Sequence, residues 1–222
     1  MINITTNEIS GDSCFIGYYP HCFSPGFLHN VKTYLGKQEN FQSGLSGWGK
    51  EIPRLQKWFQ MDGYDFSHNW KCSYPRWKSF PYDKDLLDIQ SKINFATNSF
   101  HNQLKPVTFN SCLINYYRDH NDSIKPHFDS VENFGPTPTI SILSIGGTRD
   151  IYFKRRLYNK DNPKSLKLDK INTHLNCRIR LTEGSLLVMG GATQKYYIHE
   201  IPKVSDTIDA RYSLTFRQFS CK

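Results

Sequence analysis

The 222-residue sequence lacks long hydrophobic runs, paired cysteines and low-complexity linkers. A membrane-spanning helix needs about 18 consecutive apolar residues, and no stretch of this chain comes near that length. The opening segment, MINITTNEISGD, has neither a basic leader nor a following apolar run, so no export signal is expected. These absences predict an intracellular protein, in the nucleus or the cytoplasm, with no membrane partner.

The cysteines are too scattered to indicate a disulfide framework. The six cysteines include no C-x-x-C pair, and a chain of this size can build its core without disulfide bonds. No internal repeat and no break in composition divides the chain. We therefore expect a single domain over residues 1–222, present as a monomer.

Charge and aromatic content leave the partner open. Lys and Arg outnumber Asp and Glu by 28 to 20, which gives a formal net charge of +8. A basic balance favours a polyanionic partner such as nucleic acid, but it also suits an ordinary soluble basic protein. Aromatic residues make up 14% of the chain, enough for both a core and stacking surfaces for bases.

The first part of the chain predicts two helices separated by a long irregular segment. Ser24 and Pro25 form an N-cap and first-turn pair, and apolar residues then recur at helical spacing over 25–37. A second helix is expected over 84–100. The intervening residues 41–80 are rich in Gly, Pro, Trp and Tyr, which is long for an idle connection and indicates a lid or binding loop.

Beyond residue 109 the pattern changes to short β-type segments divided by turn residues, which is typical of a sandwich or barrel. No helix-length pattern separates the later segments, so a parallel βαβ fold is disfavoured. We expect two helices and a loop to precede a β-rich C-terminal half, with residues 159–176 as a polar surface insertion. The predicted strands span residues 109–118, 139–145, 151–156, 177–181, 185–189, 196–201 and 211–219.

His127 and Asp129 form a candidate metal-binding pair. Two residues apart in an extended segment, their side chains project from the same face and can bind one ion. His199, in a later strand-like segment, is the candidate third ligand. Two histidines and one carboxylate leave coordination positions open, as in non-haem Fe(II) oxygenases. An H-x-D pair is common by chance, however, and on spacing alone an ordinary hydrogen-bonded role for each histidine is the more frequent one.

A second candidate set lies in the segment RYSLTFR, from Arg211 to Arg217. On a strand, Arg211, Ser213, Thr215 and Arg217 share one face, while the apolar residues between them point the other way. Two guanidinium groups on one face match a dicarboxylate, because each binds a carboxylate through two hydrogen bonds. The same pattern also describes a solvated strand with two surface arginines.

Ordered blocks of the sequence resemble the AlkB family of Fe(II)- and 2-oxoglutarate-dependent dioxygenases, from about Pro53 to Phe219. The blocks PRLQKWF and YDFS resemble the nucleotide-recognition lid of the eukaryotic repair branch. The strand FNSCLINYY resembles the family's N-x-Y strand, and H-F-D follows at a similar gap. The long block GSLLVMGGATQKYYIHEIP, followed by the R-x5-R segment, is the most specific of these matches.

The resemblance implies an α+β, β-rich fold with a double-stranded β-helix, or jelly-roll, core at about 107–220. N-terminal helices would pack outside this core, and a nucleotide-recognition lid would span about 41–80. The metal would be Fe(II), held by His127, Asp129 and His199. The co-substrate 2-oxoglutarate would be held by Asn115, Tyr117, Arg211, Ser213 and Arg217.

The implied reaction is oxidative demethylation of alkylated bases in DNA or RNA. Dioxygen and 2-oxoglutarate are consumed, and succinate, CO2 and formaldehyde are released. The target base leaves the stack and is held between aromatic groups. Phe66 aligns with the lid aromatic that stacks on the base, His127 would form the opposite wall, and Arg54, with its neighbours Lys50 and Lys57, would contact phosphates. A buried loop anchor and solvated loop charges are the alternative roles of these residues.

Two positions depart from the family pattern. Ser213 stands where the R-x-N-x-T-F-R form carries Asn, and Val131 stands where related repair enzymes often carry a carboxylate that reads the damaged base. Glu132 is adjacent, but a shift of one residue on a strand points to the opposite face. The preferred methylated base is therefore left open.

Two other functions are compatible with the sequence. One keeps the iron chemistry but acts on a protein side chain or a small molecule, which Val131 and the modest basic excess allow. The other is a catalytically silent nucleic-acid-binding module that has kept the fold. A module without activity has no chemical need for all three metal ligands, which argues against it.

Overall fold

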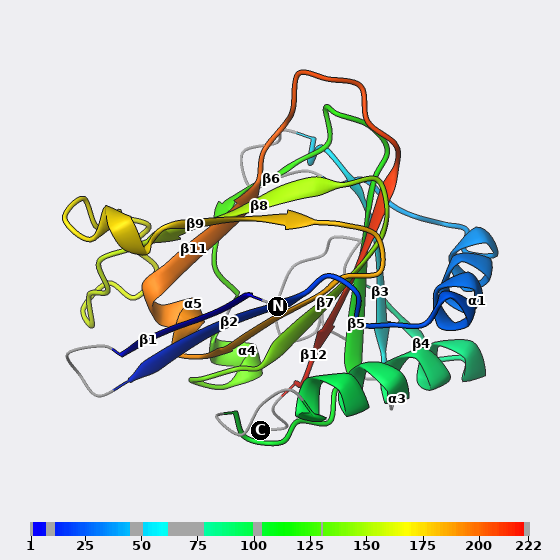
Figure 1. The fold of residues 1–222 in the computed structure, drawn as a ribbon, viewed down its shortest axis with the longest axis horizontal. Helices are drawn as coiled ribbons and strands as arrows, with labels where there is room; N and C mark the ends of the chain where they lie inside the picture. Colours follow the sequence, from blue (N-terminus) through cyan, green and yellow to red (C-terminus); the bar gives the residue numbers. More distant parts are fainter. Residues whose placement is uncertain are drawn as a thin grey trace.

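The computed structural model describes residues 2–7, 12–44, 51–61, 78–99, 104–129 and 131–219. Within this part of the chain the strands form two sheets that face each other (Figure 1). The major sheet has the order β1-β2-β10-β7-β12-β5-β3-β4, and the minor sheet has the order β6-β11-β8-β9. Neighbouring strands pair antiparallel except β3 and β4, which pair parallel.

The strands of the major sheet come from both halves of the chain. In sheet order they are β1 (Ile2–Asn7), β2 (Ser13–Tyr19), β10 (Leu186–Gly191), β7 (Ile140–Gly146), β12 (Arg211–Arg217), β5 (Ser111–Tyr117), β3 (Leu55–Gln60) and β4 (Ser79–Pro81). The minor sheet consists of β6 (Ile124–His127), β11 (Tyr197–Ile201), β8 (Arg149–Arg155) and β9 (Cys177–Leu181).

Helices cover the outer face of the major sheet. The two long ones are α1 (Pro25–Gly36) and α3 (Lys84–Ser99), and they lie together outside the barrel (Figure 1). Short helical turns, α4 (Val131–Phe134), η3 (Thr173–Leu175) and α5 (Thr193–Tyr196), lie between strands. In α1 the Ser24 hydroxyl accepts a hydrogen bond from the backbone N–H of Phe27, as expected of an N-cap. No helix in the described residues is long and apolar enough to cross a membrane.

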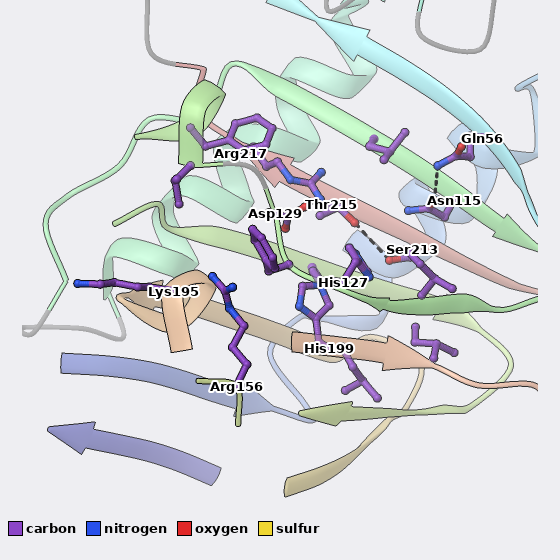
Figure 2. Close-up of a pocket in the computed structure, with 18 of the residues that line it drawn as sticks. Gln56, Asn115, His127, Asp129, Arg156, Lys195, His199, Ser213, Thr215 and Arg217 are labelled. Atoms are coloured by element: carbon purple, nitrogen blue, oxygen red, sulfur yellow. Dashed lines mark hydrogen bonds and ion pairs between the residues drawn. The ribbon is translucent and has the colours of Figure 1, made fainter. Parts of the chain in front are cut away.

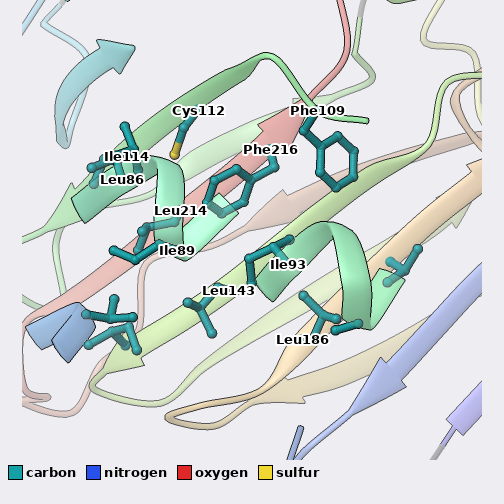
Figure 3. Close-up of a cluster of buried hydrophobic side chains, with 14 of the residues drawn as sticks. Leu86, Ile89, Ile93, Phe109, Cys112, Ile114, Leu143, Leu186, Leu214 and Phe216 are labelled. Atoms are coloured by element: carbon teal, nitrogen blue, oxygen red, sulfur yellow. The ribbon is translucent and has the colours of Figure 1, made fainter. Parts of the chain in front are cut away.

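The hydrophobic core has two layers. In the outer layer, Leu86, Ile89 and Ile93 of α3 pack onto the major sheet (Figure 3). Burial of each of these side chains contributes about 1.5–3 kcal/mol relative to exposure. The second layer lies between the two sheets, and its fully buried aromatic members are Tyr197 and Phe153. The candidate site lies beside this second layer, so both layers fix the strands that carry it.

Most predicted elements are present with small shifts at their ends. The helices expected at 25–37 and 84–100 are α1 and α3, and the predicted C-terminal strands are all present. The strands β1 to β4, which precede residue 107, were not among the predicted strands. β3 and the start of β4 lie within the range expected for the lid, so the major sheet extends into that range. A short apolar segment such as SCFIGYY (β2) does not show period-two alternation because nearly all its residues are buried.

Candidate functional site

His127 and His199 face each other across paired strands. In the antiparallel register of β6 and β11, His199 lies directly opposite His127, and their ring centroids are 4.3 Å apart. Asp129 follows β6 in the adjoining loop, and the three side chains meet in the middle of a pocket (Figure 2). His199 is 6% exposed, and the Phe153 ring packs 5.8 Å from it. The fold therefore brings together residues that are 70 or more positions apart in the chain.

A glycine turn positions the strand that carries His199. Gly191, at the end of β10, has a φ of +59°, and an added Cβ would lie 2.2 Å from the carbonyl oxygen of Ser13. Only glycine fits there, because both the backbone conformation and the close approach exclude a side chain. The chain turns at this point into α5 and then into β11.

Asp129 is held on two sides. Its Oδ1 accepts a hydrogen bond from Arg217 Nη2 at 2.9 Å, and its backbone N–H donates to Gln194 Oε1 at 2.8 Å. Its Oδ2 is buried without a hydrogen-bond partner. Among the described residues, no group of three or more His, Cys, Asp or Glu side chains has the spacing of a metal site as it stands. This holds for His127, Asp129 and His199 as well. Because Oδ1 is bound to Arg217, Oδ2 is the oxygen of Asp129 that is available to a metal ion.

The protonation states suit metal ligands. Burial lowers the pKa of His127, and burial together with the charges of His127 and Arg217 lowers the pKa of His199 to about 3. Burial raises the pKa of Asp129, but the positive charge of Arg217 and its hydrogen bond help to hold that pKa below its usual value. Neutral imidazoles and an ionised carboxylate are the forms that bind a metal. His127 Nδ1 lies 2.8 Å from the carbonyl oxygen of Lys125, so Nδ1 donates there and Nε2 is left as the ligand atom.

The two arginines of β12 are buried with unused donors. Arg211 is fully buried, and its Nη2 donates to Ser144 Oγ at 2.8 Å, while its Nε and Nη1 have no partner. Nε and Nη1 of Arg217 are likewise buried without partners. Burial lowers the pKa of Arg211 to about 10. Unused guanidinium donors in a closed site favour carboxylate ligands, because unsatisfied buried donors cost free energy. Ser213 and Thr215 lie between the arginines on the same face (Figure 2).

Asn115 and Tyr117 line the same pocket from β5. Asn115 Oδ1 accepts hydrogen bonds from Arg54 Nε and from Gln56 Nε2, each at 2.9 Å. Two guanidinium groups pack near the Tyr117 ring, with the Cζ of Arg149 5.5 Å and the Cζ of Arg211 5.3 Å from its centroid. Neighbouring side chains therefore hold Asn115 and Tyr117 in place, and both residues still line the pocket.

Arg54 lies inside the pocket wall. It is 9% exposed, and its Nη1 also donates to the carbonyl oxygen of Ser123 at 3.2 Å. It is not a solvated lid cation, and its expected contact with a phosphate stays a prediction. Lys57 points to the opposite side of the major sheet, where its Nζ donates to Gln38 Oε1 and to the carbonyl oxygen of Glu39, and its expected contact with phosphates also stays a prediction. Phe66 and Lys50 lie outside the described residues.

Val131 lines the pocket, as expected for a residue close to the metal pair. Residues 131–134 form the short helix α4, not a strand. Glu132 was expected to point away from the site because a strand was assumed at this position, and the structure has a helix there instead. A four-residue helix is too short to be recognised from hydrophobic periodicity. Phe134 of α4 packs under the guanidinium of Arg217, 5.4 Å from ring centroid to Cζ.

The pocket encloses about 850 Å³. Binding sites for small molecules and cofactors are usually about 300–1,000 Å³. The pocket is lined by two groups of polar residues. One group consists of the three candidate metal ligands with Arg211, Arg217 and Asn115, and the other consists of Arg156, Tyr158, Lys164 and Lys195. Figure 2 shows Arg156 and Lys195 on one side of the histidine pair and Gln56 and Asn115 on the other. The volume leaves room for a second, larger substrate beside a small dicarboxylate.

Sequence reasoning did not identify Gln56, Arg156 or Gln194. Gln194 is 1% exposed and binds the Asp129 backbone from α5. Gln56 binds Asn115 from β3. Arg156 follows β8 and lines the pocket. These are contacts between elements distant in sequence, so spacing carries no signal for them. The one available sign was the polar residue at 56 inside the lid-like block PRLQKWF.

Known sequences similar to this chain belong to one family of oxygenases. Residues 28–217 match the sequence model of the 2OG-Fe(II) oxygenase superfamily. The chain is 32% identical over 165 residues to the alpha-ketoglutarate-dependent dioxygenase alkB homolog 3 of Rattus norvegicus, covering 74% of this chain and 50% of that protein. It is 32% identical over 149 residues to the DNA oxidative demethylase ALKBH2 of Arabidopsis thaliana, covering 64% and 44%. The chain spans about half the length of these curated relatives, and the resemblance to AlkB proteins is confirmed.

Solved structures share the fold at low sequence identity. The structure of OsALKBH1 superimposes with a TM-score of 0.62 at 14% identity, covering 91% of this chain and 97% of that one. A prolyl hydroxylase from Trichoplax adhaerens, solved in complex with a peptide fragment, gives a TM-score of 0.56 at 10% identity, covering 92% and 83%. At such identities the likeness concerns the fold alone. It confirms the predicted jelly-roll class.

Proposed function

Because the chain belongs to the 2OG-Fe(II) oxygenase superfamily, we propose that it is a demethylase that removes N-alkyl groups from bases in DNA or RNA. The observation that carries the proposal is the position of His199 opposite His127, beside a buried Asp129 oxygen without a partner. The family implies Fe(II) as the metal, with 2-oxoglutarate and dioxygen as co-substrates. The relatives named above, an AlkB homologue and a DNA oxidative demethylase, support nucleic acid as the substrate class.

The donor set fits a ferrous ion. Two neutral imidazoles and one carboxylate oxygen, from His127, His199 and Asp129, make up the ligand set typical of non-haem Fe(II) oxygenases. Gln194 supports Asp129 through its backbone, and Lys125 supports His127 through its carbonyl oxygen. Such supporting contacts orient metal ligands and tune their basicity.

The arginines fit the two carboxylates of 2-oxoglutarate. Arg211 lies deep in the pocket with two unused nitrogen donors, and Arg217 lies next to Asp129 with two more. Arg217 is therefore placed to hold the carboxylate nearer the metal, and Arg211 the remote one. Asn115, Tyr117 and Ser213 line the pocket between them and supply amide and hydroxyl groups.

When bound, the iron couples the conversion of 2-oxoglutarate and dioxygen into succinate and CO2 to hydroxylation of the N-methyl group, which then leaves as formaldehyde. The chain's own residues position the reactants and exclude water. Arg211 and Arg217 fix the co-substrate, while Trp58, Leu113 and Phe134 form an apolar wall of the same pocket. A dry wall strengthens the electrostatic contacts made inside the site.

A second candidate function is hydroxylation or demethylation of a protein or a small molecule. The observation that favours it is Val131, an apolar residue that lines the pocket at the position where the sequence resemblance predicts a base-reading carboxylate. An apolar wall can bind a methyl-bearing group of many substrates without reading the edge of a base. The two functions differ in whether a methylated oligonucleotide stimulates turnover.

The test measures succinate and formaldehyde after anaerobic reconstitution with Fe(II) and addition of dioxygen. The substrates are DNA and RNA oligonucleotides, single- and double-stranded, carrying N1-methyladenine or N3-methylcytosine, with unmodified oligonucleotides as controls. We expect the methylated oligonucleotide to increase succinate release, and we expect one formaldehyde to form for each additional succinate. Succinate without such stimulation would favour the second candidate, and no succinate under any condition would indicate a catalytically silent binding module.

A further inference from the structure

Arg156 is a buried cation outside the metal and co-substrate sets. It is 2% exposed and lines the pocket, immediately before segment 157–176, which contains the surface insertion expected at 159–176. Most residues of this segment are exposed, which agrees with that prediction. Tyr158, Pro163 and Lys164 of the segment nevertheless line the same cavity as His127 and His199. The segment therefore forms part of the pocket wall.

The contacts of Arg156 connect this segment to the metal loop. Its Nη1 donates to the carbonyl oxygens of Pro163 and Ser165 at 2.9 and 2.6 Å. Its guanidinium lies over the ring of Phe128, the residue between His127 and Asp129, with Cζ 4.0 Å from the ring centroid. The edge of the Arg156 guanidinium thus binds segment 157–176, and its face stacks on Phe128, between the two candidate metal ligands. Only arginine has a planar cation that can make both contacts.

We infer that Arg156 is a positioning residue that fastens segment 157–176 and the Phe128 ring into one wall of the substrate site. This inference rests on the proposed function and deepens it by naming the residue that shapes the substrate side of the pocket. The ligand is the nucleic-acid strand next to the target base. Charge complementarity supports that choice, because the exposed lysines of the segment suit a phosphate backbone: Lys160, Lys164, Lys167 and Lys170.

Two further contacts make the wall continuous with α5. Arg156 Nη2 lies 3.4 Å from the carbonyl oxygen of Gln194, and Lys195 Nζ lies over the Tyr158 ring at 4.8 Å. Arg156 Nε is buried without a partner, so the guanidinium keeps one donor for a polar group of a substrate. Loss of the guanidinium would release the segment and the Phe128 ring together.

The experiment compares Arg156→Gln and Arg156→Lys with the control Arg178→Gln, which removes an arginine that is 53% exposed on the outer face of the minor sheet. We expect both Arg156 variants to raise the KM for a methylated oligonucleotide about tenfold, the effect of one lost anchoring contact. The KM for 2-oxoglutarate should change much less. Lysine should not rescue, because it keeps the charge but lacks the planar fork.

A second readout needs no turnover. Trypsin cleaves after the lysines of segment 157–176, and with Mn(II) in place of Fe(II) we expect faster cleavage there in Arg156→Gln than in wild type or Arg178→Gln. Methylated oligonucleotide should protect these sites in wild type. Equal cleavage rates, or equal increases of both KM values, would overturn the inference. A wild type that accepts no methylated oligonucleotide would instead overturn the proposed function, and the cleavage rates would still test the fastening.

Discussion

The side-chain carbonyl of Gln194 accepts a hydrogen bond of 2.8 Å from the backbone N–H of Asp129. Gln194 belongs to α5, which leads directly into the strand that carries His199. The Gln194 amide thereby links the loop that carries Asp129 to the element that leads into the strand of His199. Gln194 is 1% exposed, and its Nε2 donates to Met189 Sδ, so its orientation is also fixed.

We expect Gln194→Leu to weaken metal binding about 10- to 100-fold, the usual effect of losing a residue that supports a metal ligand. The measurement is anaerobic calorimetric titration with Mn(II) in the presence of 2-oxoglutarate. The control is Gln90→Leu, which removes a glutamine of similar burial whose Nε2 also donates to a methionine sulfur, but away from the pocket. Equal affinity in the two variants would contradict the positioning role.

We expect Arg211 to bind 2-oxoglutarate and, in the absence of that ligand, to lower the stability of the folded protein. It is fully buried with two unused donors, so replacing it by methionine should raise the unfolding free energy by about 1 kcal/mol in the absence of ligand. That gain corresponds to an increase of about 2–4 °C in Tm. Wild type should gain Tm when 2-oxoglutarate and Mn(II) are added, because a ligand that binds the folded state stabilises it.

Arg211→Met should lose the 2-oxoglutarate-dependent part of that shift. Differential scanning fluorimetry with Mn(II) alone and with both ligands separates the two effects. A variant that kept the full shift on addition of 2-oxoglutarate would show that this arginine does not bind the co-substrate.

Arg149 is expected to be structural. It is 2% exposed and donates to the carbonyl oxygens of Asp119, Asp122 and Pro202, which joins loops at one end of the barrel. Arg149→Leu leaves these buried acceptors unsatisfied and should cost about 3 kcal/mol in urea unfolding. Arg180→Leu, an exposed position on the neighbouring strand, should leave the midpoint almost unchanged. Similar midpoints for the two variants would refute the role.

Phe66 lies outside the described residues, and its role in stacking on the target base is a prediction from the sequence. Loss of base stacking on an aromatic side chain costs about 1–3 kcal/mol per base. Phe66→Ala should therefore raise the KM for a methylated oligonucleotide about 10- to 100-fold, with a smaller effect on the KM for 2-oxoglutarate. The control is Phe95→Ala, on α3 and 74% exposed. An unchanged oligonucleotide KM would remove Phe66 from the substrate site.

The sequence allowed accurate prediction where a short local pattern decides the structure. In β12 the alternation places Arg211, Ser213 and Arg217 on the pocket face and Leu214 and Phe216 in the outer core, as the period-two pattern predicts. The helices α1 and α3 were also predictable, because their apolar residues recur at helical spacing along one face.

Other features depend on contacts that no spacing encodes. The position of His199 opposite His127 follows from the pairing of β6 with β11, and the spacing of the residues alone made His199 no more than a candidate. The contacts of Gln194 with Asp129 and of Arg54 with Asn115 join elements far apart in the chain. The strand β2 lacks alternation because both of its faces are buried, so its pattern does not distinguish a strand from a loop or a helix.

The proposed function requires that His127, Asp129 and His199 hold a single ferrous ion. The most direct measurement is anaerobic calorimetric titration of Fe(II), in the presence of 2-oxoglutarate, into wild type, His199→Ala and the control His174→Ala, which replaces an exposed histidine of η3. We predict one ion per chain in wild type and in His174→Ala, and no tight binding in His199→Ala. Equally tight binding of one ion by His199→Ala would contradict the claim.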